Sequence, residues 1–426
     1  MSTYNELLEL TLWDILRVIN PSREDWLTRF HIINEFRDVI RSVESLRGAT
    51  VEPFGSFVSN LFTRWGDLDI SIELPNGLYI SHAGKKRKQT LLEDVLRTLR
   101  RKGGYHKLQF IANAKVPILK FQSNYQNISC DLSINNLNGQ MKSKLLFWIN
   151  EVDGRFRDMV LLVKEWAKAH DINDPKYGTL SSYSLSLLVI FHFQTCAPAI
   201  LPPLKEIYPS NLVDDLTGVR ADAEKHIEET CAVNIGRFKT DRSRTVNRSS
   251  LSELFVSFLA KFSDISLRAS EQGICPYTGQ WEDIASNMRW LPKTYTLFVE
   301  DPFDQPNNVA RTVSNRQIAR ISEAFQTTHR KLFSANQNQS SVIATLVRPQ
   351  ISQFVAGTRP GIPSYHNTSN RRTHPQVQSS AHSPSQVQHQ FQYKRQDGQP
   401  NNMAVKRPLQ AVHSQSQQMW RPKSDR

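Results

Sequence analysis

The sequence predicts an α+β protein: a small unit with a mixed sheet, then an all-helical central domain, then a disordered C-terminal tail. Three observations predict this order. β-rich segments separated by turn signals lie between residues 51 and 135, and helical patterns dominate from 145 to about 330. Beyond about 335, Gln, Ser, Asn, His and Pro prevail. A segment of that composition cannot bury enough apolar surface to offset chain entropy.

Residues 1–46 carry apolar side chains at three- and four-residue intervals, interrupted by Asn20-Pro21-Ser22. This spacing predicts two helices, which we expect to pack on the helical domain. The α/β unit then covers 47–144. Its predicted strands lie in 67–74, 107–122 and 128–134, with a helix over 88–104 that stops at Gly103-Gly104.

The helical domain is expected to cover 145–330. Amphipathic patterns predict helices over 155–172 and 251–265, and the stretch 181–196 is apolar nearly all round, as in a buried helix. Residues 289–314 contain three prolines and are expected to form an ordered loop. The tail is placed at 331–426.

Charge is distributed unevenly along the chain. The net charge is +13, but the residues after Arg330 hold 12 Lys and Arg against two acidic residues, which leaves +3 for the first 330 residues. A basic tail on a nearly balanced body indicates an anionic polymer as partner, with RNA, DNA or a membrane surface as candidates. The alternative is a tail that only improves solubility.

Cysteine usage and apolar runs exclude several classes of protein. The four cysteines form no Cys-x-x-Cys pair, so neither a zinc site nor a disulfide framework is indicated, and reduced thiols in the cytosol or nucleus are expected. The N-terminus has acidic residues where a signal peptide needs basic ones. The longest apolar stretch, 183–193, is too short to span a bilayer, so no membrane partner is expected.

Asp67 and Asp69 stand at the start of the first predicted strand with one residue between them. Alternate residues of a strand face the same side, so both carboxylates point one way and repel unless a cation neutralises them. Mg²⁺ suits such a pair because it takes oxygen ligands and keeps positions open for phosphate. The pair alone is weak evidence for a metal site, since an Asp-x-Asp arises roughly once by chance in such a chain.

Three additions strengthen the prediction. Gly55-Ser56 open a short helix upstream, where backbone N–H groups and a hydroxyl could hold a phosphate. Asp131 lies in an apolar strand, where an unpaired carboxylate is costly, and a third metal ligand explains it better than a solvent-facing exception. Lys164 and Lys168 share a helix face and could hold a triphosphate, or they could form a solvated flank.

Together these residues resemble the DNA polymerase β-type nucleotidyltransferase superfamily. The stretches 178–188, 251–265 and 299–311 narrow the resemblance to non-canonical poly(A) polymerases and terminal uridylyltransferases. The run from about 20 to 330 is similar to plant uridylyltransferases that tail small RNAs, including microRNAs. The 47–144 unit would then be the nucleotidyltransferase catalytic domain, and 145–330 the poly(A)-polymerase-associated domain with the nucleotide recognition motif.

The resemblance implies a role for each candidate residue. The metal ions, Mg²⁺ or Mn²⁺, would be held by Asp67 and Asp69, with Asp131 completing the site beside the RNA 3′-hydroxyl. The nucleotide would be bound by the outer-phosphate ligands Gly55 and Ser56, by the triphosphate ligands Lys164, Lys168 and Ser182, by Tyr183 stacking on the base, and by Asn136 reaching the ribose or base. Tyr183 could also simply be a core residue.

Two positions depart from the pattern of the family. Asn307 stands where some uridine-selective relatives carry a His that disfavours ATP. Base choice would then rest on Asp301, Asp304, Asn307 or a neighbour. In many relatives an Asn-Thr pair, thought to read the ribose, follows the strand of the third aspartate, and here that place reads Met-Lys-Ser (141–143).

The resulting expectation is a template-independent RNA uridylyltransferase. It would add uridines from UTP to the 3′-hydroxyl of small RNAs, single-stranded or with a duplex overhang, that lack a 2′-O-methyl group, and so promote their decay. By resemblance, partners would include small-RNA effector proteins such as Argonaute, and the location would be cytoplasmic, including RNA granules, and nuclear. The alternatives are an ATP-using poly(A) polymerase and a catalytically dead RNA-binding scaffold.

Overall fold

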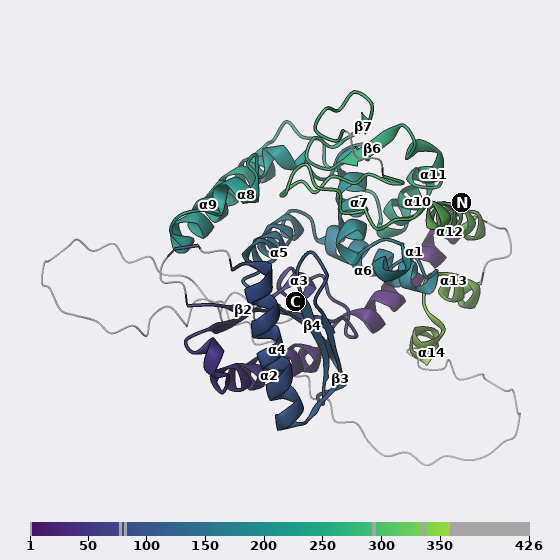
Figure 1. The fold of residues 1–426 in the computed structure, drawn as a ribbon. Coiled ribbons are helices and arrows are strands. Elements are labelled where there is room, and N and C mark those ends of the chain that lie inside the picture. The colour runs from purple at the N-terminus through teal and green to yellow at the C-terminus, as the bar shows by residue number, and fades with distance from the viewer. Residues whose placement is uncertain (1, 76–78, 81–82, 292–294, 334–337, 358–426) are drawn as a thin grey trace, which may run out of the picture. The chain divides into compact units, whose positions relative to one another are not determined.

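A five-stranded mixed sheet lies beside a group of helices in the first part of the chain (Figure 1). The structure is a computed structural model that describes residues 2–75, 79–80, 83–291, 295–333 and 338–357. These residues belong to one unit, 1–358. Residues 359–426 are a second unit, so the tail predicted there lies outside the described residues.

The sheet has the order β1-β2-β5-β4-β3. Only β2 and β5 run parallel, and the other neighbours are antiparallel. The strands are β1 Thr50–Phe54, β2 Leu68–Glu73, β3 Tyr105–Ile111, β4 Ile118–Ser123 and β5 Ser129–Ile134. The β-rich segment predicted over 107–122 is therefore a hairpin of two strands, β3 and β4.

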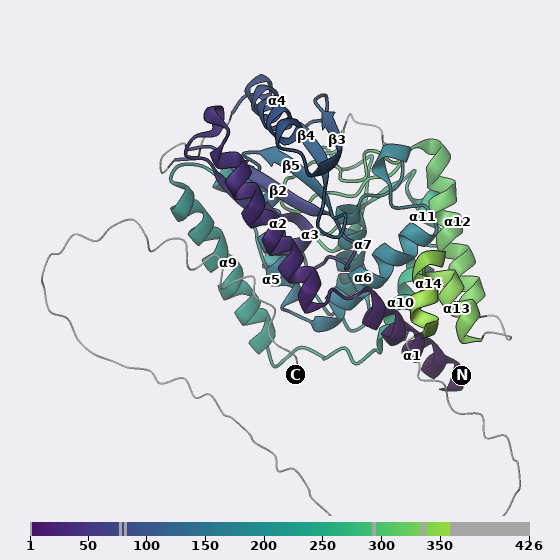
Figure 2. The same cartoon turned by 90° about the horizontal axis from the view of Figure 1, so that it is seen from below.

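Alternation along the strands gives the sheet one apolar and one polar face. On the apolar face Ile70 of β2 lies level with Leu132 of β5, and both are fully buried. Helices α2 (Arg23–Arg41) and α4 (Lys85–Lys102) pack on the sheet (Figure 2). The ring of Phe36 on α2 stacks on Phe121 of β4. The polar face is left to form the floor of a cavity.

Helices dominate the rest of the described chain. Beside the sheet lie α3 Gly55–Val58 and α5 Leu137–Asn150, and the helical domain begins with α6 Gly154–Ala169 and α7 Ser182–Thr195. It continues with α8 Leu212–Asp215, α9 Arg220–Thr240, α10 Leu251–Lys261, α11 Ile265–Arg268 and α12 Asn315–Leu332. Short 3₁₀ turns are η1 Glu44–Leu46, η2 Pro175–Tyr177 and η3 Leu204–Glu206, and a hairpin of β6 Gln272–Cys275 and β7 Gln280–Asp283 precedes α12. None of the helices in the described ranges has the length and apolarity needed to cross a membrane.

The N-terminal helices divide between the two parts of the unit. Helix α1 (Ser2–Ile19) packs on α6 and α10 of the helical domain. Helix α2 packs on β1 and α4 instead, so the expectation that both helices pack on the helical domain is wrong for α2. The break at Asn20-Pro21 turns the chain, and the capping box between Ser22 and Asp25 restarts it as a helix over the sheet.

The predicted start of the tail at 331 is also wrong. Two further helices, α13 Gln339–Leu346 and α14 Pro349–Gly357, follow α12, and α13 and α14 pack on α1 (Figure 2). Val342, Leu346 and Val355 are buried. Nine of the twenty residues in 338–357 are hydrophobic, and its aliphatic residues recur at helical spacing and find a complementary surface. The polar composition that predicts disorder begins only after this stretch.

Candidate functional site

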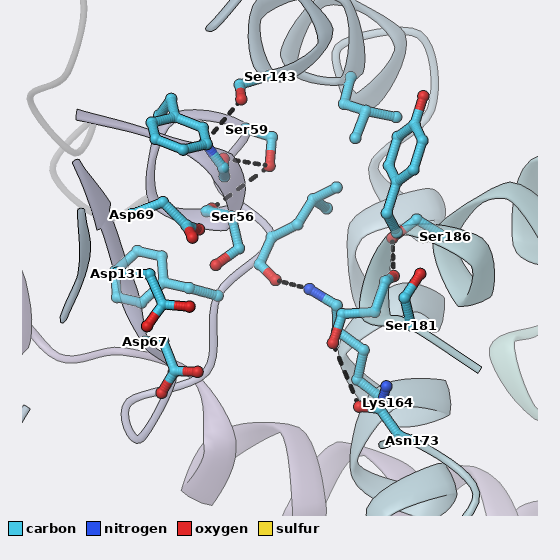
Figure 3. A pocket seen from close by; sticks show the side chains of 18 of the residues that line it. Ser56, Ser59, Asp67, Asp69, Asp131, Ser143, Lys164, Asn173, Ser181 and Ser186 are labelled. Atoms are coloured by element: carbon cyan, nitrogen blue, oxygen red, sulfur yellow. Dashed lines mark hydrogen bonds between the residues drawn. The ribbon is translucent and has the colours of Figure 1, made fainter. Parts of the chain in front are cut away.

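A cavity of about 730 Å³ lies between the polar face of the sheet, helices α3, α6 and α7, and the loop that carries Asp301 (Figure 3). Most of the predicted site residues line it: Gly55, Ser56, Asp67, Asp69, Asp131, Lys164, Lys168, Ser182, Tyr183 and Asp301. Asn136, Asp304 and Asn307 are not part of its lining.

The three aspartates lie at one edge of this cavity, where β2 and β5 run side by side (Figure 3). Asp69 and Asp131 are register partners on these parallel strands, and Asp67 immediately precedes β2. Burial and the neighbouring Asp131 and Asp67 raise the pKa of Asp69 to about 7. Burial and Asp131 also raise the pKa of Asp67. The structure thus brings three carboxylates together, and the ionised forms of Asp67 and Asp69 are disfavoured there.

Lys120 continues this row, and sequence reasoning missed it. It is the register partner of Asp131 on β4, and its Nζ lies 2.6 Å from Asp131 Oδ2. The other oxygen, Asp131 Oδ1, is buried without a hydrogen-bond partner. The alternating pattern of β4 could have revealed Lys120, because it is the one charged residue in "ILKFQS".

The chemistry of this row fits a divalent cation. Among the residues that the structure describes, no group of three or more His, Cys, Asp or Glu is already arranged to hold a metal ion. Lys120 instead supplies positive charge to Asp131. The unpartnered buried oxygen of Asp131 and the raised pKa of Asp69 nevertheless indicate oxygen ligands that lack a counter-charge, which is what Mg²⁺ or Mn²⁺ would provide.

Gly55 lies against the carboxylates, and its place requires glycine. Its φ is +68°, and a Cβ there would sit 2.0 Å from Asp69 Oδ2. Its N–H donates to Ser143 Oγ over 2.7 Å. Helix α3, which begins at Gly55, is a single turn. The Gly-Ser signal therefore marks a close approach of backbone to carboxylate.

Lys164 and Lys168 face the carboxylates from α6 across the cavity. The Nζ of Lys164 donates to the carbonyl of Leu61 over 2.7 Å. Burial and then Lys168 lower the pKa of Lys164 to about 7. Burial and Arg348 likewise lower the pKa of Lys168. Lys164 is buried and Lys168 is half-buried, and neither forms an ion pair with a carboxylate of the described residues, as expected of a phosphate-binding pair.

The far end of the cavity contains an aromatic ring held by charged groups. The hydroxyl of Tyr183 donates to Asp301 Oδ1 over 3.0 Å. Lys142 Nζ lies 2.6 Å from Asp301 Oδ2, 3.3 Å from Asp304 Oδ2 and 5.8 Å from the centre of the Tyr183 ring. The sequence analysis did not predict Lys142 as a site residue. The Met-Lys-Ser at 141–143, which stands where many relatives carry an Asn-Thr pair, was the signal that could have revealed it.

The remaining predicted residues take other places. Ser182 lines the cavity and donates its hydroxyl to Asn173 Oδ1 over 3.2 Å. Asn136 caps α5, where its side chain accepts from the N–H of Gly139, and it does not line the cavity. The backbone of Asn307 closes the loop by accepting from the N–H of Asp301 over 2.8 Å.

Comparison with known proteins agrees with this fold. Residues 8–151 match the family described as the central palm domain of mitochondrial-like poly(A) RNA polymerase. The chain is 61% identical over 363 residues to Protein HESO1 of Arabidopsis thaliana, which covers 85% of this chain and 71% of that protein. It is 34% identical over 217 residues to the poly(A) RNA polymerase GLD2 of Mus musculus, covering 51% of this chain and 42% of that protein.

Solved structures show the same fold. A cytoplasmic RNA terminal U-transferase matches with a TM-score of 0.62 at 23% identity, covering 82% of this chain and 100% of the other. The structure of mtPAP in complex with UTP matches with a TM-score of 0.62 at 20% identity, covering 82% and 73%.

These similarities, with the cavity and its carboxylates, define a nucleotidyltransferase. The chain belongs to the family of non-canonical poly(A) polymerases and terminal uridylyltransferases, close to plant HESO1. It is an RNA terminal nucleotidyltransferase.

Proposed function

We propose that this enzyme uses UTP to add uridines to the 3′-hydroxyl of small RNAs. The observation that carries the choice of base is the position of Lys142 between Asp301 and the ring of Tyr183. An ammonium group donates hydrogen bonds and accepts none. It therefore favours the O4 carbonyl of uracil over the amino group that adenine presents at the equivalent position.

The rest of the cavity supports a nucleotide lying with its base at Tyr183 and its phosphates toward the carboxylates. Tyr183 offers a ring face for stacking, and its hydroxyl is fixed by Asp301. Lys164 and Lys168 lie on the path between them and would hold the triphosphate, with Ser56 and Ser182 at its margins. Gly55 lets the backbone pass close enough to Asp69 to keep that carboxylate in place.

Asp67, Asp69 and Asp131 would hold Mg²⁺ or Mn²⁺. When bound, two such ions supply positive charge to the attacking and leaving oxygens of an in-line displacement. Asp131 would accept the proton of the RNA 3′-hydroxyl through its unpartnered Oδ1. Lys120 would release Asp131 Oδ2 when a cation replaces its charge.

An ATP-using polymerase is the second candidate, and Asn307 favours it, because a His at that place disfavours ATP in some relatives. The test offers all four nucleoside triphosphates at equal concentration with one single-stranded RNA primer. We expect runs of U at the 3′ end. Predominant addition of A would overturn the uridine assignment, and tailing by Asp67→Ala/Asp69→Ala would overturn the metal site.

The choice of RNA follows from the attack by the 3′-hydroxyl. A 2′-O-methyl group on the last ribose lies beside that hydroxyl and should block the reaction, so methylated primers should not be tailed. A role in small-RNA decay, contact with Argonaute-type proteins and a cytoplasmic and nuclear location remain predictions.

A further inference from the structure

A second cavity of about 280 Å³ meets the first at Asp67, which lines both. Its other walls come from the start of α2, the loop before β2 and the turn before β5: Glu24, Asp25, Arg64, Trp65, Gln126, Asn127, Ile128 and Ser129. Asp67 lies at the end of the carboxylate row that is far from Ser143 (Figure 3). Ser143 directly follows Lys142, a residue of the predicted base pocket. The second cavity therefore opens on the side of the carboxylates away from the predicted base pocket.

Trp65 lines this cavity, and the ring of Phe354 lies against Trp65. Trp65 is 41% exposed and Phe354 of α14 is 59% exposed, and their ring centres lie 6.2 Å apart at an angle of 34°. The guanidinium of Arg64 lies 5.5 Å from the centre of the Trp65 ring. Two large rings and a cation, left in water beside a reaction centre, form a platform on which unpaired bases can stack and a phosphate can bind.

The platform is held rigidly from beneath. Arg29 is fully buried, and its guanidinium donates to the carbonyls of Arg64 and Gly66 on either side of Trp65. On the other side, Arg348 at the start of α14 forms a two-pronged ion pair with Glu165 of α6. The backbone that carries Trp65 and the start of the segment that carries Phe354 are therefore anchored to the fold, which lowers the ordering cost of binding.

The chain that continues from α14 has the charge that RNA requires. Residues 358–426 hold ten Lys and Arg against two acidic residues. They begin four residues after Phe354. The acidic Asp25 in the cavity is already bonded to Ser22 and lies 3.5 Å from the Arg64 guanidinium. The composition of the chain after α14 therefore favours a polyanion as partner.

We propose that Arg64, Trp65 and Phe354 form the binding site for the RNA nucleotides that precede the reacting 3′ end. Bases stack on Trp65 and Phe354, a phosphate lies on Arg64, and the terminal ribose reaches the carboxylates at Asp67. The proposal rests on the proposed function, since it concerns the same reaction. Because stacking needs unpaired bases, the site takes single strands and 3′ overhangs, and a blunt duplex gains nothing from it.

The test measures tailing of RNA primers of two, four, eight and twelve nucleotides by wild type, Trp65→Ala, Trp65→Phe and Phe354→Ala. We expect Trp65→Ala to raise the KM for the twelve-nucleotide primer about ten-fold, with kcat, the KM for UTP and the dinucleotide reaction unchanged. Trp65→Phe should restore most of the affinity. Trp13→Ala, at a Trp that is 46% exposed on α1, is the matched control and should change nothing.

Fluorescence anisotropy of labelled RNA without nucleotide separates this proposal from the choice of base. Weaker binding by Trp65→Ala, in a protein that melts like wild type, supports the site even if ATP proves to be the substrate. Arg64→Gln should reduce the slope of log K against log salt by about one. Unchanged RNA binding in Trp65→Ala, Phe354→Ala and Arg64→Gln would overturn the proposal. So would a loss of kcat on the dinucleotide, which would mean that Trp65 only supports Asp67.

Discussion

Lys142 and Asp301 are 159 positions apart in the chain, yet their side chains form a 2.6 Å ion pair within the cavity. Lys142 comes from α5, beside the catalytic sheet, and Asp301 comes from a loop of the helical domain. The pair thus connects the two parts of the fold where the base of the nucleotide is expected. Asp301 accepts from Tyr183 with its other oxygen, so all three side chains form one unit.

The first prediction concerns Lys142→Met, which keeps the length of the side chain and removes its donor. We expect the ratio of kcat/KM for UTP over ATP to fall about ten-fold, because one hydrogen bond to a base edge contributes about 1–3 kcal/mol of discrimination. Lys142→Arg should keep the preference for UTP. Lys144→Met is the matched control, since Lys144 lies on the same helix but bonds Glu224. An unchanged ratio in Lys142→Met would show that another group reads the base.

Gly55→Ala is expected to abolish most activity without unfolding the protein. The added Cβ would meet Asp69 Oδ2 at 2.0 Å, and the φ of +68° is unfavourable for alanine. Displacing the carboxylate by that much should lower kcat about 100-fold. Gly236→Ala on α9 is the control, because a Cβ there meets nothing within 4 Å, and it should stabilise the protein by about 0.5–1 kcal/mol. Gly55→Ala with normal kcat would contradict the role assigned to Gly55.

The sequence was sufficient for the residues whose neighbours are local and insufficient for those whose partners are distant. Alternation predicted that Asp67 and Asp69 face the same side, and the apolar strand around Asp131 predicted a third carboxylate of the site. The structure adds that Asp69 and Asp131 are register partners. Lys120 and Lys142 were missed because the role of a lysine depends on its ion-pair partner. Their partners, Asp131 and Asp301, come from other elements of the fold. Asn136 lies outside the cavity lining, where its side chain caps α5.

The boundary of the tail was misjudged for a related reason. The Gln- and Ser-rich composition of the tail was extended too far toward the N-terminus, although nine of the twenty residues in 338–357 are hydrophobic. Local sequence does not show that Arg348 pairs with Glu165, whose side chain is 1% exposed, or that the aliphatic side chains of this stretch pack on α1 and α12. The same limit applies to helix α2. Its amphipathic pattern predicts that one face is buried but does not identify the elements on which that face packs.

This boundary leads to a prediction about truncation. Deleting 358–426 should leave the melting temperature near that of wild type and weaken RNA affinity at moderate salt. Deleting 338–426 should destabilise the protein strongly, since it removes the buried residues of α13 and α14 and leaves Glu165 buried without Arg348. Equal melting temperatures of the two deletions would contradict the packing described here.

Point variants isolate the ion pair from the rest of that segment. Arg348→Met should lower the free energy of unfolding by about 3 kcal/mol, because it leaves a buried carboxylate unpaired. Glu165→Gln combined with Arg348→Met should recover part of the loss, since no charge is then left buried. Arg17→Met is the control, because Arg17 is 64% exposed in its pair with Asp14 and should cost less than about 1 kcal/mol. Urea unfolding at constant salt measures all three.

The last prediction concerns the pH dependence of stability and His192. The ring of His192 is 1% exposed, and burial, followed by the charge of Lys261, lowers its pKa to about 3. An unfolded histidine has a pKa of about 6.5. Below about pH 6.5 the His192 imidazole therefore binds a proton in the unfolded chain but not in the folded protein. The free energy of unfolding consequently decreases as the pH falls. The contribution of His192 should reach about 1.4 kcal/mol for each pH unit between about 6 and 3.

His192→Gln keeps a polar group opposite Ser257, whose hydroxyl lies 3.2 Å from His192 Nε2, and removes the titration. The difference in unfolding free energy between wild type and His192→Gln should thus shift in favour of the variant as the pH falls from 7 to 5. A difference that stays constant over that range would mean that His192 titrates alike in the folded and unfolded protein.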